Sequence, residues 1–382
     1  MYRSILILSF FIGRDLQTDL IICTILFSCA VCSIFLIAYV SSLLIRRRDN
    51  EIQRIKDERE SLLIRILFDE NSKELNNDLL VNLNEFKSKE KRIHLRKKKR
   101  KLLRQMMIDE MLNLKKNLSG VGVEDLYRLY EILGLHEDSY QKLISKKYHL
   151  MVMGIRELSE MNCHIYYRFI YRCTNHIQED VRIEAQVAVV RLFGVKGLRF
   201  LSRVTYPISE WQQMTLLHLL NNMKNEKPKG IDNWLDSKND SVIIFSLRLA
   251  DKYNCFELLG KIQRFLHYPN DLVKIQSIFC LRNIYDENTE FQLLAYYQIV
   301  NKTVQLAVLD VLQSLSTQNS LFFLRQQLVN NDDVEICFAV LKVLHTLSDR
   351  MDIINTIEKK PEIIESIMQM LDQIEGEKQL YS

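Results

Sequence analysis

One apolar position recurs along the second half of this chain at a nearly constant step. It is occupied in turn by Val181, Trp211, Val242, Val273, Val304 and Val334. The steps between them are 30, 31, 31, 31 and 30 residues. A period in this range indicates one supersecondary unit stacked on copies of itself. Such arrays offer extended binding surfaces, so the period constrains the function as well as the fold.

Each recurrence begins a stripe of apolar and small residues with helical spacing. In the clearest copy, Val181 is followed by Ala185, Ala188 and Leu192, which share one face of a helix with 3.6 residues per turn. The same stripe returns at Val242, Ser246, Leu249 and Tyr253, and at Val273, Ser277, Cys280 and Ile284. Small side chains in such a stripe allow a neighbouring helix to approach closely. We therefore predict a helix at each recurrence, packed against its neighbours.

Polar pairs precede the apolar position in most copies, as in Asn239-Asp240, Asn270-Asp271 and Asp332-Asp333. Such pairs supply an N-cap and a negative charge at a helix N-terminus. A second apolar run follows in each unit, over residues 198–201, 256–266, 291–297 and 321–328. Only 4 Pro and 10 Gly occur in 382 residues, and no long Val/Thr alternation is present. The expected fold is all-α, with one helix-turn-helix per unit.

The repeat resembles the short, PBS-lyase-type variety of the HEAT-like family over roughly residues 147–349. The resemblance rests on Asp180-Val181-Arg182, Ala185, Ala188, Leu192, Gly194, Gly197-Leu198 and Leu201. Residues 155–213 also look like membrane-anchored HEAT-repeat proteins of the kind found in Bacteroidota-type bacteria. The resemblance implies an α-solenoid. Lys274 is the only basic counterpart of Arg182 in the later copies. We therefore expect the Asp-to-Arg ladder that connects repeats in longer HEAT proteins to be incomplete in this chain.

The N-terminal part of the chain contains one long apolar run. Residues 20–45 include no charged side chain, and they exceed the roughly 20 residues that a helix needs to cross a bilayer. Arg46, Arg47 and Arg48 end the run. The positive-inside rule then predicts a single-pass helix of the inner membrane, with residues 1–19 outside and the solenoid in the cytoplasm. A cleaved signal peptide is the rival interpretation, disfavoured by the length of the run and the arginine triplet.

Residues 46–118 form a basic region with 21 Lys and Arg against 13 Asp and Glu. The densest part, residues 87–104, contains the run Arg96, Lys97, Lys98, Lys99, Arg100 and Lys101. We interpret residues 46–118 as a helical cytoplasmic juxtamembrane region and residues 119–382 as the solenoid.

Three interpretations of the basic run remain open. It can be a solvated helix face. It can bind anionic lipid headgroups together with the arginine triplet, since each basic residue near a membrane surface contributes about 1 kcal/mol. It can also bind nucleic acid, which the absence of aromatic residues from 87–104 disfavours because unpaired bases stack on aromatic rings.

The cysteines and histidines give little support for chemistry. Cys29 and Cys32 have the spacing of a redox pair, but they lie inside the apolar run, where an activated thiol is not expected. Cys163-His164, Cys173 and His176 lack the paired short spacings of a zinc site. No Gly-rich phosphate loop, His-Glu-x-x-His or Gly-x-Ser-x-Gly motif is present. We predict no catalytic residue, no metal site and no cofactor.

These features predict a membrane-tethered protein–protein interaction scaffold or adaptor at the cytoplasmic face of the inner membrane. Its protein partner is not identified by any motif. Aromatic residues dominate interface hot spots, so the candidate partner-binding side chains are Tyr206, Trp211 and Trp234. The competing interpretation places these side chains in the core or between repeats. For Trp211 a core position is favoured, because it stands at the recurring apolar position.

Two alternative functions remain. An accessory subunit of a machine that makes or exports envelope polysaccharide would differ from the scaffold only in its partner. An enzyme is the second alternative, and it is disfavoured. Some HEAT-like proteins resemble bilin lyases, and others resemble alkyl-purine DNA glycosylases. A lyase would need a cofactor pocket, which the sequence cannot show. Residues 119–382 hold 29 Lys and Arg against 33 Asp and Glu, and a duplex-binding surface should be basic. A small-molecule ligand is neither indicated nor excluded.

Overall fold

The computed structural model describes residues 21, 24–44, 46–47, 50, 53, 97–118, 120–221, 223, 226–357 and 361–381. No strand occurs among these residues, which form helices, turns and loops. They belong to two compact units, residues 1–138 and 139–382, hereafter unit 1 and unit 2. The prediction of an all-α fold is confirmed. The predicted boundary at residues 118–119 falls within unit 1.

Unit 1 contains the apolar helix Thr24–Leu44, which has 21 residues and a mean hydropathy of 2.2. None of its most apolar stretch is buried against the rest of the protein. By length and composition it can cross a membrane, a test that a signal sequence also passes. Helix α3 (Lys97–Asn117) packs against α4 (Val121–Ile132), and Arg104 Nε donates to Asp138 at 2.5 Å. Helix α5 (Leu135–Leu143) crosses into unit 2.

Unit 2 is a solenoid of successive helix pairs, closed by a long last helix, α19 (Pro361–Tyr381). Among the described residues the pairs are α6 (Tyr148–Glu160) with α7 (Tyr167–Arg172), α8 (Glu179–Phe193) with the 3₁₀ helix η4 (Gly194–Ser202), α9 (Glu210–Asn221) with α10 (Ile231–Leu235), α11 (Asp240–Lys252) with α12 (Leu259–Arg264), α13 (Asp271–Cys280) with α14 (Thr289–Tyr297), α15 (Lys302–Leu315) with α16 (Leu321–Asn330), and α17 (Val334–Leu347) with α18 (Arg350–Ile357). Short 3₁₀ turns flank α7 and α12. The HEAT-like helix-turn-helix units are therefore confirmed.

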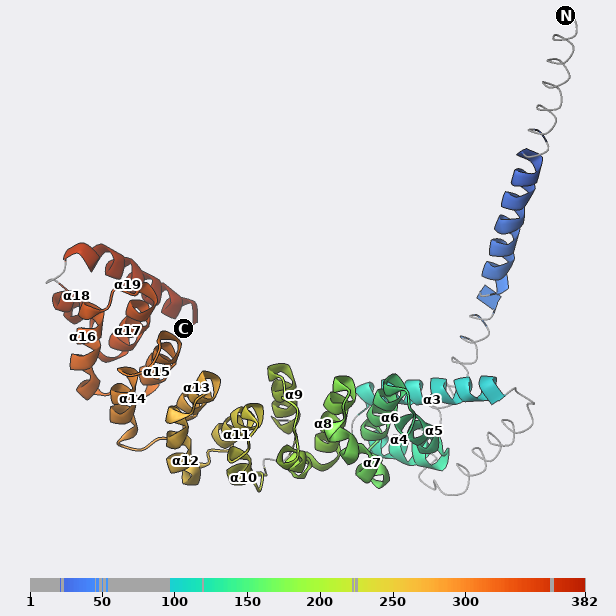
Figure 1. Cartoon of the computed structure of the whole chain (residues 1–382), viewed down its shortest axis with the longest axis horizontal. Coiled ribbons are helices and arrows are strands. Elements are labelled where there is room, and N and C mark those ends of the chain that lie inside the picture. The colour runs from blue at the N-terminus through green and yellow to red at the C-terminus, as the bar shows by residue number, and fades with distance from the viewer. Residues whose placement is uncertain are drawn as a thin grey trace, which may run out of the picture. The chain divides into compact units, whose positions relative to one another are not determined.

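The two members of each pair form two rows. We call α6, α8, α9, α11, α13, α15 and α17 the first-helix row, and α7, η4, α10, α12, α14, α16 and α18 the second-helix row. In Figure 1, α11, α13 and α15 lie on one side of unit 2, and α10, α12 and α14 lie on the other. Along the first-helix row, α11 packs on α13, α13 on α15 and α15 on α17. The core therefore runs along the solenoid between the two rows.

The buried stripes are those that the repeat predicted. Val181, Ala185 and Ala188 are fully buried, as are Val242 and Val273 in the next apolar copies. Tyr253 ends its stripe only half-buried, because it already belongs to the turn after α11. The small residues at the centres of the stripes let consecutive first helices approach closely.

The register predicted for Trp211 and Val334 is wrong. From α8 onward the buried position is the third residue of the first helix. In α9 and α17 it is held by Gln212 and Ile336, each only 4% exposed. Trp211 is 79% exposed and Val334 is 64% exposed. One helix position corresponds to about 100° of rotation, so a slip of one or two residues moves a side chain off the core face.

Asparagine and glycine form the turns from first to second helices. Asn254 adopts a φ of 47° after α11, and the N–H of the buried Cys255 then donates to the carbonyl of Ala250 at 3.0 Å. Asn162 and Cys163 form the same turn after α6, with a φ of 54°. Asn is one of the few residues that tolerates this left-handed conformation. The turn directs the chain back along the preceding helix.

Gly194 and Gly197 form the corresponding turn after α8. Gly194 has a φ of 56°, and a Cβ on Gly197 would lie 2.8 Å from the Cα of Val190. The backbone of η4 therefore lies directly against α8. Both glycines belong to the motif that carries the HEAT-like resemblance, and the structure explains why glycine stands at each.

Asparagines connect consecutive first helices in the later repeats. The side chains of Asn239, Asn270 and Asn301 accept the first backbone N–H groups of their own helices. Asn270 also donates to Asp240, and Asn301 donates to Asp271, each at 2.7 Å. This asparagine ladder stands where longer HEAT proteins would use arginine. Arg182 instead donates to the backbone carbonyls before its own helix.

Candidate functional site

A pocket of about 480 Å³ opens on the second-helix row, where α7, η4 and α10 follow one another. We call it the aromatic–basic pocket. Its lining residues are Tyr167, Tyr171, Arg199, Ser202, Arg203, Lys229, Gly230, Asn233 and Trp234. They come from three consecutive repeats, so the pocket exists only because the repeats stack.

Aromatic rings form the walls of this pocket. Tyr167 packs against Phe193 with the ring centroids 4.4 Å apart, and its ring lies 5.5 Å from that of Tyr171. Trp234 is buried, and its Nε1 donates to the Ser202 hydroxyl at 2.9 Å. Gly230 has a φ of 122°, and a Cβ there would lie 3.4 Å from the Trp234 ring. The Trp234 ring is thus held in place from two sides.

Three cations surround these walls. Arg199, Arg203 and Lys229 line the pocket and are exposed, and none of the described residues that line it is a carboxylate. Within the described part of the chain, no ion pair involves any of the three. The Arg199 carbonyl accepts a hydrogen bond from the Tyr171 hydroxyl at 3.4 Å, but its guanidinium stays available. The pocket therefore combines an uncompensated positive charge with an aromatic wall.

The Tyr167 phenol remains a neutral hydrogen-bonding group. Burial raises the pKa of the Tyr167 phenol, and neighbouring Tyr171 raises it further, while the positive charge of Arg199 opposes both effects. The Tyr167 hydroxyl therefore stays protonated near neutral pH, where it can donate a hydrogen bond to an anion.

Two other cations of unit 2 are held by carboxylates of a neighbouring repeat. Lys261 of α12 lies 2.9 Å from Asp232 and 2.7 Å from Asp236. Arg282, which follows α13 on the first-helix row, pairs with Asp310 of α15. These pairs hold consecutive repeats together and leave no uncompensated positive charge for a ligand. The unpaired cations of the aromatic–basic pocket differ from them in that respect.

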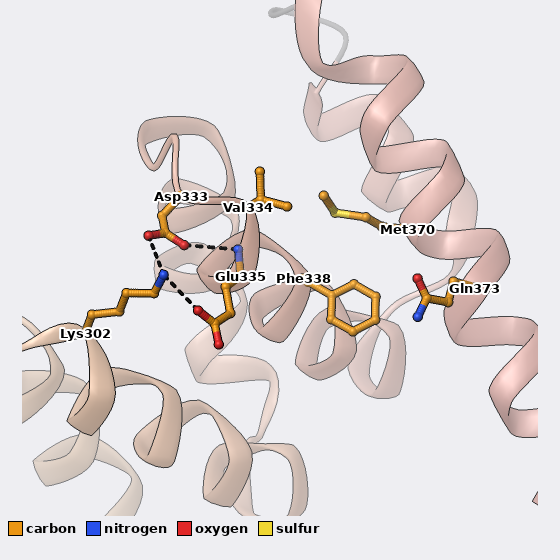
Figure 2. A pocket seen from close by; sticks show the side chains of 7 residues that line it. All are labelled: Lys302, Asp333, Val334, Glu335, Phe338, Met370 and Gln373. Atoms are coloured by element: carbon orange, nitrogen blue, oxygen red, sulfur yellow. Dashed lines mark hydrogen bonds and ion pairs between the residues drawn. The ribbon is translucent and has the colours of Figure 1, made fainter. Parts of the chain in front are cut away.

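A second pocket, of about 530 Å³, lies where α15 begins and α17 faces α19 (Figure 2). Lys302 lies 2.8 Å from both Asp333 and Glu335, which neutralise it. Figure 2 shows Phe338 on the side of the pocket nearest Met370 and Gln373 of α19. In this α17–α19 pocket the charged side chains pair with one another beside an apolar wall. It therefore lacks the unpaired cations of the aromatic–basic pocket.

The three aromatic candidates from the sequence do not gather at one site. Trp234 lines the aromatic–basic pocket. Tyr206 is half-buried, and the Arg182 guanidinium lies 4.1 Å from the centroid of the Tyr206 ring. The backbone carbonyl of Tyr206 accepts a hydrogen bond from the Asn239 side chain. Tyr206 therefore joins repeats. Trp211 projects from α9 into solvent.

The basic candidates are only partly described. Arg46 and Arg47 are exposed at the end of the apolar helix, and Lys101 is exposed on α3. Lys97, Lys98, Lys99 and Arg100 lie in the first turns of α3, but their side chains are outside the described residues, as are Arg48 and Arg96 entirely. Their assignment to anionic lipid stays a prediction.

The cysteines and histidines that lie close together in the sequence do not form one site: the two cysteines are buried, and His176 lies in a turn. Cys163 and Cys173 are buried, and burial raises the pKa of the Cys173 thiol to about 11. His176 Nδ1 accepts the backbone N–H of Gln178. Among the residues that the structure describes, no group of three or more His, Cys, Asp or Glu side chains is placed to hold a metal ion.

Sequence reasoning missed every pocket residue except Trp234. A signal was present, because Tyr171, Ser202 and Asn233 recur at steps of 31 residues on the second helices. Arg203 and Trp234 follow directly after two of them. The apolar period of the first helices is more regular and dominates the sequence pattern, so the recurrence on the second helices is less visible.

No protein-family model matches this sequence, and no curated protein matches it. Among solved structures, the chain is similar to one in the complex of CpcE and CpcF of phycocyanin lyase from Nostoc sp. PCC7120. The match covers 71% of this chain and 89% of the other, with 12% sequence identity and a TM-score of 0.24. At this score the likeness carries no argument about activity, substrate or partner.

Proposed function

We propose that this chain is a non-catalytic scaffold, tethered to the inner membrane by helix Thr24–Leu44, that binds a protein partner on unit 2 in the cytoplasm. The observation that carries the proposal is the combination, in one chain, of a repeat array with an apolar helix whose most apolar stretch is not buried by the rest of the protein. An exposed apolar surface of that length is unfavourable in water and is expected to be covered by lipid. The array supplies the binding surface.

The orientation follows from charge. Arg46 and Arg47 lie exposed after the apolar helix, and basic residues remain on the cytoplasmic side of a single-pass helix. Unit 2 is then cytoplasmic, where its cysteines stay reduced. A membrane-impermeant maleimide should label a Lys146→Cys variant only after the cells are permeabilised. Labelling in intact cells would contradict this orientation.

The tether can be tested by fractionation. Replacing Ile34 and Ile37 by Asp places two charges near the centre of the apolar helix, at a cost of about 2.5–3.5 kcal/mol each. The double variant should leave the membrane fraction. The matched control replaces Leu272 and Phe322, both exposed on unit 2, by Asp and should stay in it. A double variant that remains fully membrane-bound would contradict the tether.

The scaffold role can be tested by crosslinking in cells. A photoreactive residue at Arg203 samples the second-helix row, and one at Trp211 samples the first-helix row, since both positions are exposed. We expect Arg203 to capture one reproducible protein, identified by mass spectrometry. If neither position captures a reproducible protein from membranes, the scaffold proposal fails.

A further inference from the structure

The aromatic–basic pocket has the chemistry of a recognition site rather than of a repeat junction. Its three cations, Arg199, Arg203 and Lys229, make no ion pair within the described residues, whereas Lys261 in the next repeat is held by two carboxylates. Keeping like charges close together without a counter-charge is unfavourable for the free protein. An anionic ligand would relieve that repulsion.

The extent of the pocket indicates the size of the ligand. Its lining comes from three consecutive second helices. Packed helix axes lie about 8–10 Å apart, so three of them span roughly 20 Å. An extended peptide covers that distance with about six residues, at about 3.3 Å per residue. A single phosphate group would engage only part of such a site.

The composition of the lining also suits a peptide. Arginine and aromatic residues are enriched at protein interfaces, and both occur here. Ser202 already fixes the Trp234 ring, and Tyr167 is already packed against Phe193. These side chains therefore lose little conformational entropy when a ligand binds. Asn233 adds an exposed amide that can donate to a carboxylate.

We infer that the aromatic–basic pocket binds an extended acidic segment of a protein partner, with Arg199, Arg203 and Lys229 holding its carboxylates and the Tyr167–Tyr171 wall contacting an apolar side chain between them. This inference rests on the proposed scaffold function and names the chemistry of the partner. It assigns the binding surface to the second-helix row, at the repeats formed by α7, η4 and α10.

The test uses the full-length chain in detergent micelles and a fluorescein-labelled peptide of alternating Glu and Phe, with fluorescence anisotropy as the readout. Arg203→Gln combined with Lys229→Gln should weaken binding about tenfold or more, because two charge-assisted contacts are lost. Lys146→Gln combined with Arg264→Gln removes the same charges from exposed positions outside the pocket. That control should change affinity less than about twofold.

A second variant keeps all three cations. Asn233→Asp places a carboxylate in the pocket. It should weaken the binding of the acidic peptide by a similar factor, since the new carboxylate competes with the peptide for the same cations. Circular dichroism on heating should show that all variants keep the stability of the unmodified chain. A peptide with Gln in place of Glu should bind weakly to every variant.

Several outcomes would overturn the inference. One is that the unmodified chain does not bind the acidic peptide. Another is that the pocket variants and the control lose affinity equally, which would indicate a nonspecific charge effect. A third is that inorganic phosphate displaces the peptide at micromolar concentration, which would identify a small-anion site. If crosslinking captures a partner while the acidic peptide does not bind, the scaffold stands and only this inference fails.

Discussion

In the repeats that begin at Asn239, polar side chains connect one repeat to the next: cap asparagines bind the aspartate of the preceding helix, and Lys261 and Arg282 are held by carboxylates. In the repeats before Asn239, the buried position of α9 holds Gln212, and the pocket cations Arg199, Arg203 and Lys229 make no ion pair within the described residues. Ion pairs join first helices in the earlier repeats as well, as between Arg156 and Glu184. The difference lies at the aromatic–basic pocket, whose cations stay available for a partner, whereas Lys261 in the next repeat is held by two carboxylates.

The earlier repeats keep their packing by other means. Gln212 donates to the buried side chain of Gln186, which in turn donates to the Thr174 carbonyl at 2.8 Å. Gly197 brings η4 directly against α8. Both sets of repeats bury an apolar stripe, but the earlier repeats add close backbone approach and one buried amide pair, whereas the later repeats add side-chain caps. The difference can be tested by substitutions that affect one set of repeats and not the other.

The largest effect is expected at Gly197. Gly197→Ala places a Cβ 2.8 Å from the Cα of Val190, so η4 must move away from α8, at a cost of about 1–3 kcal/mol or more. Gly260→Ala in α12 is the control, because its Cβ meets nothing within 4 Å. The control should stabilise the helix by about 0.5–1 kcal/mol. Urea unfolding measures both, and equal midpoints would contradict the close approach.

The buried amide pair comes next. Gln212→Val leaves the Gln186 side-chain carbonyl without its donor, at a cost of about 1–3 kcal/mol for a buried unsatisfied group. Changing Gln186 to Leu as well should cost less than the sum of the two single changes, because both polar partners are then removed. A double-mutant cycle measures the coupling. Additive costs would show that the two amides do not act as a pair.

The caps should give a smaller difference between the two regions. Asn270→Ala removes a side-chain cap and the bond to Asp240, at a cost of about 1 kcal/mol. Gln178, the equivalent residue before α8, makes no side-chain cap. Gln178→Ala should therefore leave the unfolding midpoint unchanged. Similar losses for both variants would remove the distinction between earlier and later repeats.

The smallest effect is a dependence of stability on pH in the later repeats. Hydrogen bonds from Lys274, and then from Asn301, lower the pKa of Asp271 below its ordinary value. A lowered folded-state pKa contributes stability above the unfolded-state pKa, and this contribution is lost as the pH falls through the folded-state value. The unfolding midpoint of the Asp271→Asn variant should therefore fall less steeply on acidification below about pH 4. Parallel pH profiles would contradict this assignment.

Much of the fold could be predicted from the sequence because it depends on local periodicity. The buried stripes beginning at Val181, Val242 and Val273, and the caps at Asn239 and Asn270, lie where the repeat placed them. The prediction failed at Trp211, where the neighbouring Gln212 is the buried residue. A polar residue can occupy a core position only when a distant partner satisfies it, and Gln186 on another helix is not visible in the local pattern.

The sequence by itself determined the class of the fold, the step of the repeat and the presence of one apolar helix near the N-terminus, because each of these depends on residues close together in the chain. The tertiary structure alone decided which cations are left unpaired. Arg203 and Lys261 are both basic residues of the second-helix side of the solenoid, but only Lys261 meets carboxylates from the preceding repeat. Whether a charge is neutralised depends on which side chains the stacking brings within a few ångströms, since Coulomb energy depends on distance in space.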